Sequence, residues 1–291
     1  MGIKKERLKV LVTGADGMVG SYVDFGIKTN RSSLDVTDPK KTLAVIKGHK
    51  PDVILHLAAL TDVDQCERDP NRAYLINSVG AYHVALAARE CGAKIVYIST
   101  AGVFDGKKKG PYAEDDIPNP QNYYGYSKFL GELAICGVLT DHLIIRTCWM
   151  MGGGPQKDKK FVAKIIGQLM RPGTKEIDAV SDQVGSPTFA KDLVAAIKRL
   201  IDEDARGIYH IANAGVASRF DVAKKIVSLV RPDIRVNAVP TSFFHLDAKR
   251  TMNEALSSKV DLMRPWGQAV EDYIKSEWMD VVRSARSERE S

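Results

Sequence analysis

Long hydrophobic runs are missing from this chain. Its 291 residues contain no apolar stretch of the roughly 18 residues that a membrane-spanning helix requires. Residues 1–7 are mostly charged and run directly into a predicted strand, without the apolar core of a signal peptide. We therefore expect a cytoplasmic protein with no membrane partner.

Cysteine is also scarce, which argues against a fold held together by disulfides or by a structural metal. The few cysteines are scattered and have no metal-type spacing: Cys66, Cys91, Cys136 and Cys148. This pattern predicts free thiols in a reducing compartment. We expect no metal ligand among the site residues, and the sequence leaves a divalent metal requirement open.

The excess of positive charge is small. A formal net charge of +6 and a pI near 9.0 suit an anionic ligand. The lysine clusters at residues 107–109 and 157–160 are short and loop-like, as solvated loop charge usually is. We therefore expect no nucleic-acid partner.

What the first half does contain is a regular alternation of strands and helices. The strands are nearly continuous in apolar residues, which indicates burial on both faces of a parallel sheet. Strand–helix alternation predicts an α/β fold with a doubly wound sheet. We expect strands at 8–13, 52–57, 94–99 and 142–146, and helices after the first strand and at 39–48, 71–91 and 123–139.

The pattern changes after about residue 150. A glycine-rich loop follows, and then helices at 161–170, 191–201 and 219–230 with a strand at 208–211. We expect a Rossmann-type NAD(P)-binding domain over residues 1–150. Residues 151–291 should form mainly a smaller substrate-binding lobe that is partly interleaved with it.

A glycine-rich turn follows the first strand, with the spacing Gly14-x-x-Gly17-x-x-Gly20. Glycines at such a turn let a pyrophosphate approach the backbone at a helix N-terminus, where free N–H groups and the helix dipole favour anions. In this strand–turn–helix context we interpret the turn as a dinucleotide site.

A second motif carries acid–base chemistry. Tyr124 and Lys128 are four residues apart, so on a helix they share one face. A lysine ammonium beside a phenol favours the phenolate and lowers the tyrosine pKa from its ordinary value of about 10 toward neutral. The Thr100 hydroxyl, at the end of a predicted strand, could hold a substrate carbonyl oxygen near that phenol.

These motifs, together with His56-Leu-Ala-Ala59, resemble an extended short-chain dehydrogenase/reductase. Within that superfamily the chain is similar to the dTDP-4-dehydrorhamnose reductase family, for example in Ser99-Thr-Ala-Gly-Val-Phe-Asp-Gly106. The resemblance covers most of residues 8–260, through segments 34–38, 58–67, 98–106, 124–132, 146–149, 182–188 and 207–210.

The resemblance implies roles for matching positions. Thr100, Tyr124 and Lys128 would be catalytic, with Tyr124 and Lys128 also touching the cofactor. A substrate site would include Ala101, Val103, Trp149 and Arg250. The remaining cofactor-binding positions would be Gly14, Asp16, Gly17, Met18, Val19, Gly20, Arg31, Asp35, Val36, Leu57, Ala58, Ala59 and Thr61.

The choice of cofactor depends on the segment Thr29-Asn30-Arg31-Ser32. An NAD site usually has an acidic side chain there for the ribose 2′-hydroxyl, whereas an arginine suits a 2′-phosphate. No acid stands at its centre, and Arg31 is our candidate for the phosphate. We favour NADP(H) and keep NAD(H) as the alternative.

Three departures from the family bear on the substrate. Ala101 and Gly102 replace an aspartate and a tyrosine beside the catalytic threonine, Lys160 replaces an asparagine, and the C-terminal motif reads Arg250-Thr-Met-Asn253-Glu-Ala-Leu256. The resemblance implies an enzyme, an NADP(H)-dependent reductase of a nucleotide-activated 4-keto sugar in dTDP-rhamnose biosynthesis. The alternatives are a nucleotide-sugar epimerase and a non-catalytic cofactor-binding regulatory subunit, and a homodimer stays open.

Overall fold

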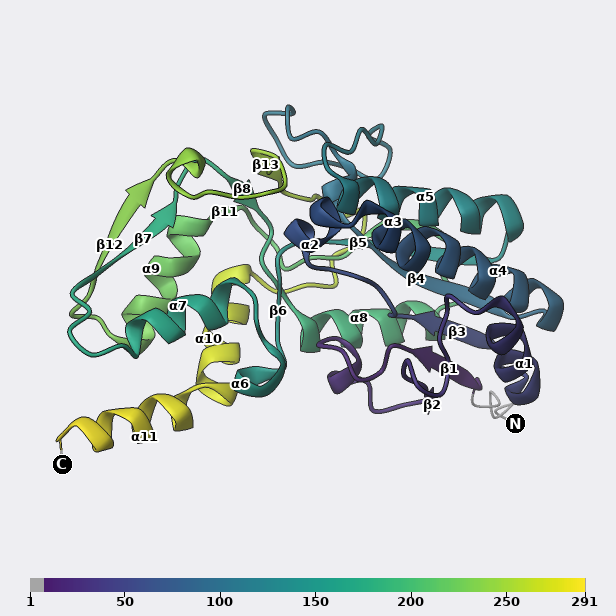
Figure 1. Cartoon of the computed structure of the whole chain (residues 1–291), viewed down its shortest axis with the longest axis horizontal. Helices are drawn as coiled ribbons and strands as arrows, with labels where there is room; N and C mark the ends of the chain where they lie inside the picture. The colour runs from purple at the N-terminus through teal and green to yellow at the C-terminus, as the bar shows by residue number, and fades with distance from the viewer. Residues whose placement is uncertain (1–7, 291) are drawn as a thin grey trace.

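The computed structural model describes the backbone of residues 8–290 and the side chains of residues 8–284. The chain forms a large lobe around a sheet and a smaller lobe of helices and short strands beside it (Figure 1). Among the described residues, no helix is both long enough and apolar enough to cross a membrane.

The large lobe is built on a parallel sheet, as the sequence predicts, and this sheet has six strands, of which β2 was not predicted. Their spatial order is β10-β5-β4-β3-β1-β2, and every neighbouring pair is parallel. This order reverses direction between β1 and β3, which makes their carboxyl ends a topological switch point. The strands are β1 (Val10–Thr13), β2 (Ile27–Lys28), β3 (Val53–His56), β4 (Lys94–Thr100), β5 (His142–Thr147) and β10 (Gly207–His210).

Helices cover both faces of this sheet because successive side chains of each strand point to opposite faces. On one face, Leu11 and the side chains of neighbouring strands that point to the same side pack against three helices. These are α1 (Pro39–His49), α4 (Gly80–Cys91) and α5 (Tyr123–Val138). On the other face, Val10 and Val12 pack against α8 (Ala190–Asp202) and the loop that carries Val23 and Phe25. The expected double burial of the strands is confirmed.

The helix expected after the glycine turn does not form. Only the 3₁₀ turn η1 (Gly20–Tyr22) follows β1 before the chain re-enters the sheet at β2. The thirteen intervening residues, 14–26, must leave the end of β1 and come back to the start of β2. Gly20 also packs closely within this connection, where a Cβ would lie 2.3 Å from the Ala15 carbonyl oxygen. A helix of several turns has no room in so short a connection.

The helix expected over residues 71–91 is confirmed as one unbroken helical run with a π-helical turn inside it. After the separate short helix α2 (Val63–Arg68), the run consists of α3 (Pro70–Tyr74), the π-helical turn η2 (Leu75–Val79) and α4, which closes at Gly92 as predicted. The π-turn carries Asn77, whose side chain bonds the backbone of Leu60 outside the helix. Such turns often mark functional positions in helices.

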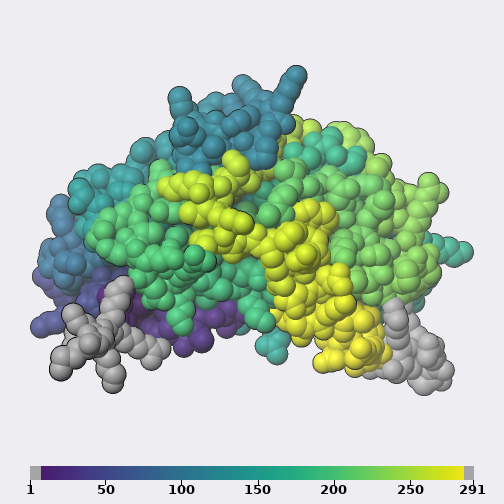
Figure 2. All heavy atoms as spheres, turned by 180° about the vertical axis from the view of Figure 1, so that it is seen from behind, coloured from purple at the N-terminus to yellow at the C-terminus, as the bar shows by residue number. Residues whose placement is uncertain are grey.

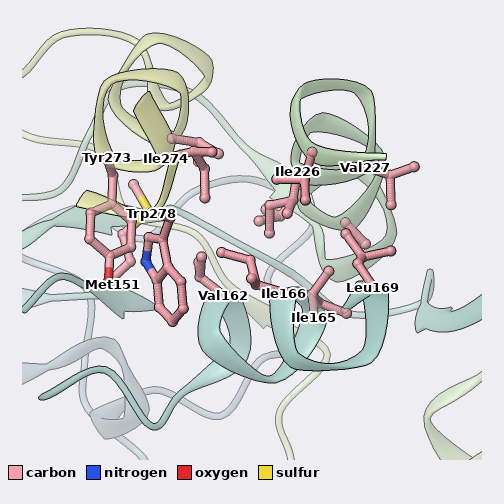
Figure 3. Packing of buried hydrophobic residues seen from close by; sticks show 14 of the residues in the cluster. Met151, Val162, Ile165, Ile166, Leu169, Ile226, Val227, Tyr273, Ile274 and Trp278 are labelled. Atoms are coloured by element: carbon pink, nitrogen blue, oxygen red, sulfur yellow. The ribbon is translucent and has the colours of Figure 1, made fainter. Parts of the chain in front are cut away.

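The small lobe has its own hydrophobic core. Met151, Val162 and Leu169 meet Ile226 and Tyr273 there, between three helices (Figure 3). The elements are α6 (Gly154–Lys157), α7 (Phe161–Leu169), α9 (Arg219–Val230), α10 (Trp266–Glu277), α11 (Met279–Glu290) and the 3₁₀ turn η4 (Thr241–Phe243). The short strands pair as β6 (Met150–Met151) with β9 (Thr188–Phe189), β7 (Glu176–Val180) with β12 (Arg235–Val239), and β8 (Val184–Gly185) with β11 (Ala217–Ser218) and β13 (Asn253–Glu254).

The second half of the chain also contributes to the large lobe. β10 completes the large sheet at one edge, and α8 covers one of its faces. The segment 256–265 returns across the back of the molecule onto this region (Figure 2). There the Lys259 ammonium donates to the Ile208 carbonyl at 2.6 Å, and Arg264 pairs with Asp192 at 2.8 Å.

The position of α5 depends on two glycines that let it touch the backbone of its neighbours. A Cβ on Gly125 would lie 2.2 Å from the Gly102 carbonyl oxygen in the 3₁₀ turn η3 (Ala101–Val103). A Cβ on Gly131 would lie 2.4 Å from the Tyr97 hydroxyl and 2.6 Å from the Asn77 carbonyl oxygen. Any larger residue must push the helix off the sheet.

This close packing is testable by stability measurements. We expect Gly131→Ala to lower the free energy of unfolding by about 2 kcal/mol, because overpacked sites of this kind cost about 1–3 kcal/mol. Gly137→Ala on the same helix meets no atom within 4 Å and should instead stabilise by about 0.5–1 kcal/mol. Urea unfolding of both variants measures the difference, and equal stabilities would contradict this account of the packing.

Candidate active site

Thr100, Tyr124 and Lys128 come together at the carboxyl edge of the sheet. Thr100 ends β4, and its hydroxyl accepts the Gly102 N–H at 3.0 Å. Tyr124 lies in the first turn of α5, within hydrogen-bonding reach of the Thr100 hydroxyl. The helix begins there because the Asn122 side chain accepts the Gly125 N–H at 2.9 Å.

Burial decides the electrostatics of this trio. Burial raises the pKa of Tyr124 above its ordinary value, while the hydrogen bond with Thr100 lowers it by a smaller amount. Burial also lowers the pKa of Lys128 to about 7, against a smaller opposing effect of Glu132. The phenol pKa therefore does not move toward neutral as expected, because the lost hydration of the phenolate outweighs the hydrogen bond with Thr100.

An aromatic ring and an amide hold the base of the site. The Lys128 ammonium lies 4.0 Å from the centre of the Tyr97 ring, where the π-face attracts a cation. The Asn77 amide donates to the Leu60 carbonyl and to the Ser127 hydroxyl, both at 2.9 Å, and its oxygen accepts the Leu60 N–H at 2.8 Å. Asn77 thus joins the loop after β3 to α5.

Sequence reasoning overlooked Asn77 and Tyr97. Asparagine is a poor helix former, and Asn77 lies in the interior of the helix predicted over residues 71–91. An asparagine in such a place indicates a side chain that bonds elsewhere, and this was the available signal. Tyr97 carries no comparable signal, because a tyrosine in a buried strand fits ordinary core packing.

The glycine turn and the end of β3 form a cradle at the switch point. A Cβ on Gly14 would lie 2.6 Å from the Ala58 nitrogen, so only glycine lets these two segments meet. The Thr13 hydroxyl lies 2.7 Å from His56 Nδ1 and accepts the Ala58 N–H at 3.3 Å. Burial lowers the pKa of His56 to about 3, so this histidine is neutral and serves to connect β1 and β3.

The open side of the cradle fits a pyrophosphate. Asp16 and Gly17 are exposed, and a Cβ on Gly17 would meet only the Gly14 carbonyl oxygen, at 3.3 Å. Met18 and Val19 follow, both half-buried. Exposed backbone without side chains is what close approach of a phosphate requires. The cradle thus has the predicted composition, without the helix expected behind it.

The other predicted cofactor positions surround this cradle. Leu57, Ala58 and Ala59 follow β3 and are half-buried, and Thr61 is exposed just before α2. Arg31 lies past β2 with 78% of its side chain exposed, 3.4 Å from the Asp35 carboxylate.

Val36 lies deeper than a ligand-contacting residue would. Its side chain is buried in the core, where a Cβ on Gly80 would lie 2.8 Å from it. The Val36 carbonyl also has a partner already, His83 Nδ1 at 2.9 Å, and a contact of this residue with the cofactor stays a prediction.

The predicted substrate residues divide into two groups. Ala101 and Val103 are buried in a cluster with Phe104 and Tyr112, so their side chains face the protein and not the cleft. Substrate contact at these two positions stays a prediction. The 3₁₀ turn that carries them is held under α5, and only its backbone borders the trio.

Trp149 and Arg250 lie where the two lobes meet. The Arg219 guanidinium lies 3.6 Å from the Trp149 ring centre, and the indole N–H donates to Glu254 at 2.6 Å. Arg250 pairs with Asp64 on α2 at 2.7 Å. A stacked arginine therefore already covers the Trp149 ring, and sequence reasoning missed Arg219 because it begins an ordinary amphipathic helix.

Metal ligands are not grouped in this region. The described residues include no cluster of three or more His, Cys, Asp or Glu side chains that could hold a metal ion. The four cysteines are free thiols.

A parallel sheet with a phosphate cradle at its switch point, and a Thr–Tyr–Lys trio beside that cradle, defines a nucleotide-dependent oxidoreductase of the short-chain dehydrogenase/reductase type. The model of the RmlD substrate binding domain family matches residues 8–278. The chain therefore belongs to the dTDP-4-dehydrorhamnose reductase family, within the extended short-chain dehydrogenase/reductases, as its motifs predict.

Individual relatives agree with this assignment. The chain is 36% identical over 273 residues to the dTDP-4-dehydrorhamnose reductase of Mycobacterium tuberculosis, covering 89% of this chain and 87% of that protein. It is 34% identical over 241 residues to the dTDP-4-keto-6-deoxy-D-glucose reductase of Streptomyces niveus, covering 79% and 82%. The crystal structure of the Bacillus anthracis dTDP-4-dehydrorhamnose reductase in complex with NADP matches with a TM-score of 0.87 and 33% identity, covering 93% and 99%.

The low pKa of Lys128 predicts a pH-dependent stability. Between its folded-state pKa of about 7 and its ordinary value of 10.5, the unfolded chain holds a proton that the folded chain does not. The free energy of unfolding of the wild type, relative to Lys128→Met, should therefore rise with pH in this window by up to about 1.4 kcal/mol per unit.

Urea unfolding of both proteins at several pH values measures this slope. Lys40→Met, at an exposed position on α1, controls for the removal of a lysine. A difference between wild type and Lys128→Met that stays constant from pH 7 to about pH 9 would contradict the assignment.

Proposed function

We propose that this protein is an NADP(H)-dependent reductase of a nucleotide-activated 4-keto sugar, most like dTDP-4-dehydrorhamnose. The observation that carries the proposal is the meeting of Thr100, Tyr124 and Lys128 beside the phosphate cradle, in a chain of this family. Such a reductase completes dTDP-L-rhamnose synthesis, and we place it in the cytoplasm.

Tyr124 is the proton donor of the reduction. A bound nicotinamide supplies the hydride. Thr100 and Tyr124 hold the carbonyl oxygen between their hydroxyl groups, and Tyr124 gives up its proton as negative charge develops there. Because burial raises the pKa of Tyr124, the phenol is protonated at neutral pH and ready to donate.

Lys128 supports this transfer from one helical turn away. With a pKa of about 7 it changes protonation near neutral pH, and its charged form stabilises negative charge that develops on the phenol. The Tyr97 ring beneath it compensates part of the lost hydration of the ammonium. Asn77 and Ser127 fix the helix turn between the two catalytic side chains.

NADP(H) is the favoured cofactor. Arg31 stands past the end of β2 with its guanidinium exposed, and no acid occupies the centre of the segment 29–32. A guanidinium suits the 2′-phosphate that distinguishes NADP from NAD. The related Bacillus anthracis enzyme crystallised with NADP. NAD(H) remains the alternative cofactor.

Cations at the lobe junction suit the diphosphate of a nucleotide sugar. Burial lowers the pKa of Arg219 to about 10 and also lowers that of Lys160. Arg250 adds a third positive charge close to Arg219. Burial is the main cause of both shifts, so an incoming phosphate would stabilise the charged forms through charge-assisted hydrogen bonds.

The departure at Ala101 and Gly102 bears on which sugar fits. A Cβ on Gly102 would be 3.4 Å from the Thr100 hydroxyl and 3.7 Å from the Tyr124 ring, which are ordinary contacts. The glycine therefore leaves room beside the trio that a larger residue would fill. A reductase of a differently configured keto sugar, such as the Streptomyces niveus relative, is the second candidate for this reason.

A homodimer is the proposed assembly. Four exposed apolar residues follow one face of α5 with alternating spacings of three and four, and α4 lies beside it (Figure 1). Such spacing suits helix-to-helix packing, and a two-fold axis would place this face against its copy. The face, called the α4/α5 stripe here, consists of Leu75 and Val79 on η2 just before α4, Tyr82 on α4, and Tyr123, Tyr126, Leu130 and Leu133 on α5.

Turnover of the expected substrate tests the function. Purified protein with NADPH and dTDP-4-dehydro-6-deoxy-L-mannose should consume NADPH, followed by its absorbance. Tyr124→Phe should lower kcat by about 10²–10⁴-fold with nearly unchanged NADPH affinity, because only the transferable proton is removed.

Other results of this assay point elsewhere. NADPH binding without oxidation of any nucleotide keto sugar tested would contradict the reductase proposal and favour a regulatory subunit. Interconversion of two sugars without net consumption of NADPH would favour an epimerase. Equal loss of turnover and cofactor affinity in Tyr124→Phe would make that residue structural.

The assembly has its own test. Leu130→Glu combined with Leu133→Glu should convert a dimer into a monomer in size-exclusion chromatography with light scattering, because charge at the centre of an apolar contact is costly. Ile117→Glu is the matched control, since Ile117 is 87% exposed and outside the stripe. A wild type that is monomeric at micromolar concentration would refute the dimer.

A further inference from the structure

The phosphate cradle of this chain lacks the usual source of positive potential. An α-helix N-terminus attracts anions through its unpaired N–H groups and its summed dipole. Here the cradle leads only into the 3₁₀ turn Gly20–Tyr22, and within the described chain no α-helix lies between β1 and β2. A single 3₁₀ turn aligns few peptide dipoles, so a bound pyrophosphate needs positive charge from another element.

One segment of the small lobe is fixed beside the cradle. We call residues 152–160 the strap. Near its start, the Gly153 N–H donates to the Tyr22 hydroxyl at 2.5 Å, and that hydroxyl donates to Glu277 on α10 at 2.7 Å. Figure 1 shows α6, the helical part of the strap, next to α10 on the side that faces the large lobe.

The strap is anchored a second time near its end. Asp158 is 3% exposed, accepts the Tyr273 hydroxyl at 2.9 Å, and accepts the Lys160 N–H at 2.8 Å. A buried carboxylate with two donors holds its backbone firmly. Lys157 directly precedes Asp158, so its backbone is held between two anchored points.

The side chain of Lys157 already reaches the cradle. Its ammonium donates to the Asp16 carbonyl at 3.0 Å, in the turn between Gly14 and Gly17. Lys157 is an exposed residue, and an ammonium has three donors. It can therefore keep this bond and also donate to a phosphate oxygen at the same turn.

We propose that Lys157 is a cofactor-binding residue, whose ammonium the small lobe places against the dinucleotide pyrophosphate at the turn 14–19. The charge of this lysine replaces the missing helix dipole. The inference rests on the proposed NADP(H) function, and it makes cofactor binding a contact between both lobes. Two phosphate groups of NADP then have different partners. Lys157 binds the pyrophosphate, and Arg31 binds the 2′-phosphate.

Cofactor affinity, measured without substrate, tests this assignment. NADPH and NADH are titrated separately into each unliganded variant, followed by nicotinamide fluorescence at low and moderate salt. Lys157→Met should weaken both cofactors by the same factor, about tenfold, because both carry the pyrophosphate. Its salt dependence should also be shallower, since one phosphate contact is gone.

Matched variants separate the alternatives. Lys159→Met removes a neighbouring exposed lysine of the strap and should leave both affinities unchanged. Lys157→Arg should keep most of the affinity, and Arg31→Met should weaken NADPH alone. Thermal unfolding without cofactor shows whether Lys157→Met is folded, and the Lys157→Arg comparison stands even where Lys157→Met is destabilised.

The outcomes distinguish this inference from the proposed function. Wild-type affinity in Lys157→Met overturns the inference and leaves the reductase intact. A loss confined to NADPH also overturns it, since the lysine would then contact the 2′-phosphate. A wild type that binds both cofactors but reduces no keto sugar contradicts the proposed function alone, and one that binds neither contradicts both.

Discussion

The contact of α5 with the backbone of its neighbours is the constraint on which the site depends. Gly125 lies against the turn that follows Thr100, and Gly131 lies against Tyr97 and the π-turn that holds Asn77. Without these glycines the helix would stand farther from the sheet. Tyr124 would then leave Thr100, and Lys128 would lose the Tyr97 ring. The close packing of α5 therefore also fixes the geometry of the catalytic residues.

The same closeness explains the electrostatics of the trio. Removing water from a phenol and an ammonium disfavours the phenolate and the ammonium ion. Tyr124 therefore stays protonated, and the pKa of Lys128 falls to about 7. At the junction of the lobes the balance differs. Arg250 has a carboxylate partner in Asp64. Arg219 is stacked on Trp149 near Glu254, and burial lowers its pKa. One region is suited to proton transfer and the other to an anion.

Much of this arrangement could be read from the sequence. Strands that are buried on both faces consist of nearly continuous apolar residues, so they can be predicted from sequence. The predicted large sheet is confirmed. The glycine turn and the Tyr124–Lys128 spacing are local patterns, because short-range geometry fixes them. One local prediction nevertheless failed. The helix after Gly20 does not form because the chain must return to β2 within thirteen residues. The helix over residues 71–91 does form, and the sequence did not reveal the π-helical turn inside it, where Asn77 bonds Leu60.

The sequence by itself determined the fold class, the family motifs and which residue types meet at the sheet edge, since these depend on periodicity and spacing along the chain. Tertiary structure alone decided what surrounds them. Burial is a property of the whole fold, so the pKa directions of Tyr124 and Lys128 and the enclosure of Val103 are invisible in the sequence. The approach of Lys157 to Asp16 joins residues 141 positions apart. No local pattern specifies such a contact, because it exists only once both lobes have packed together.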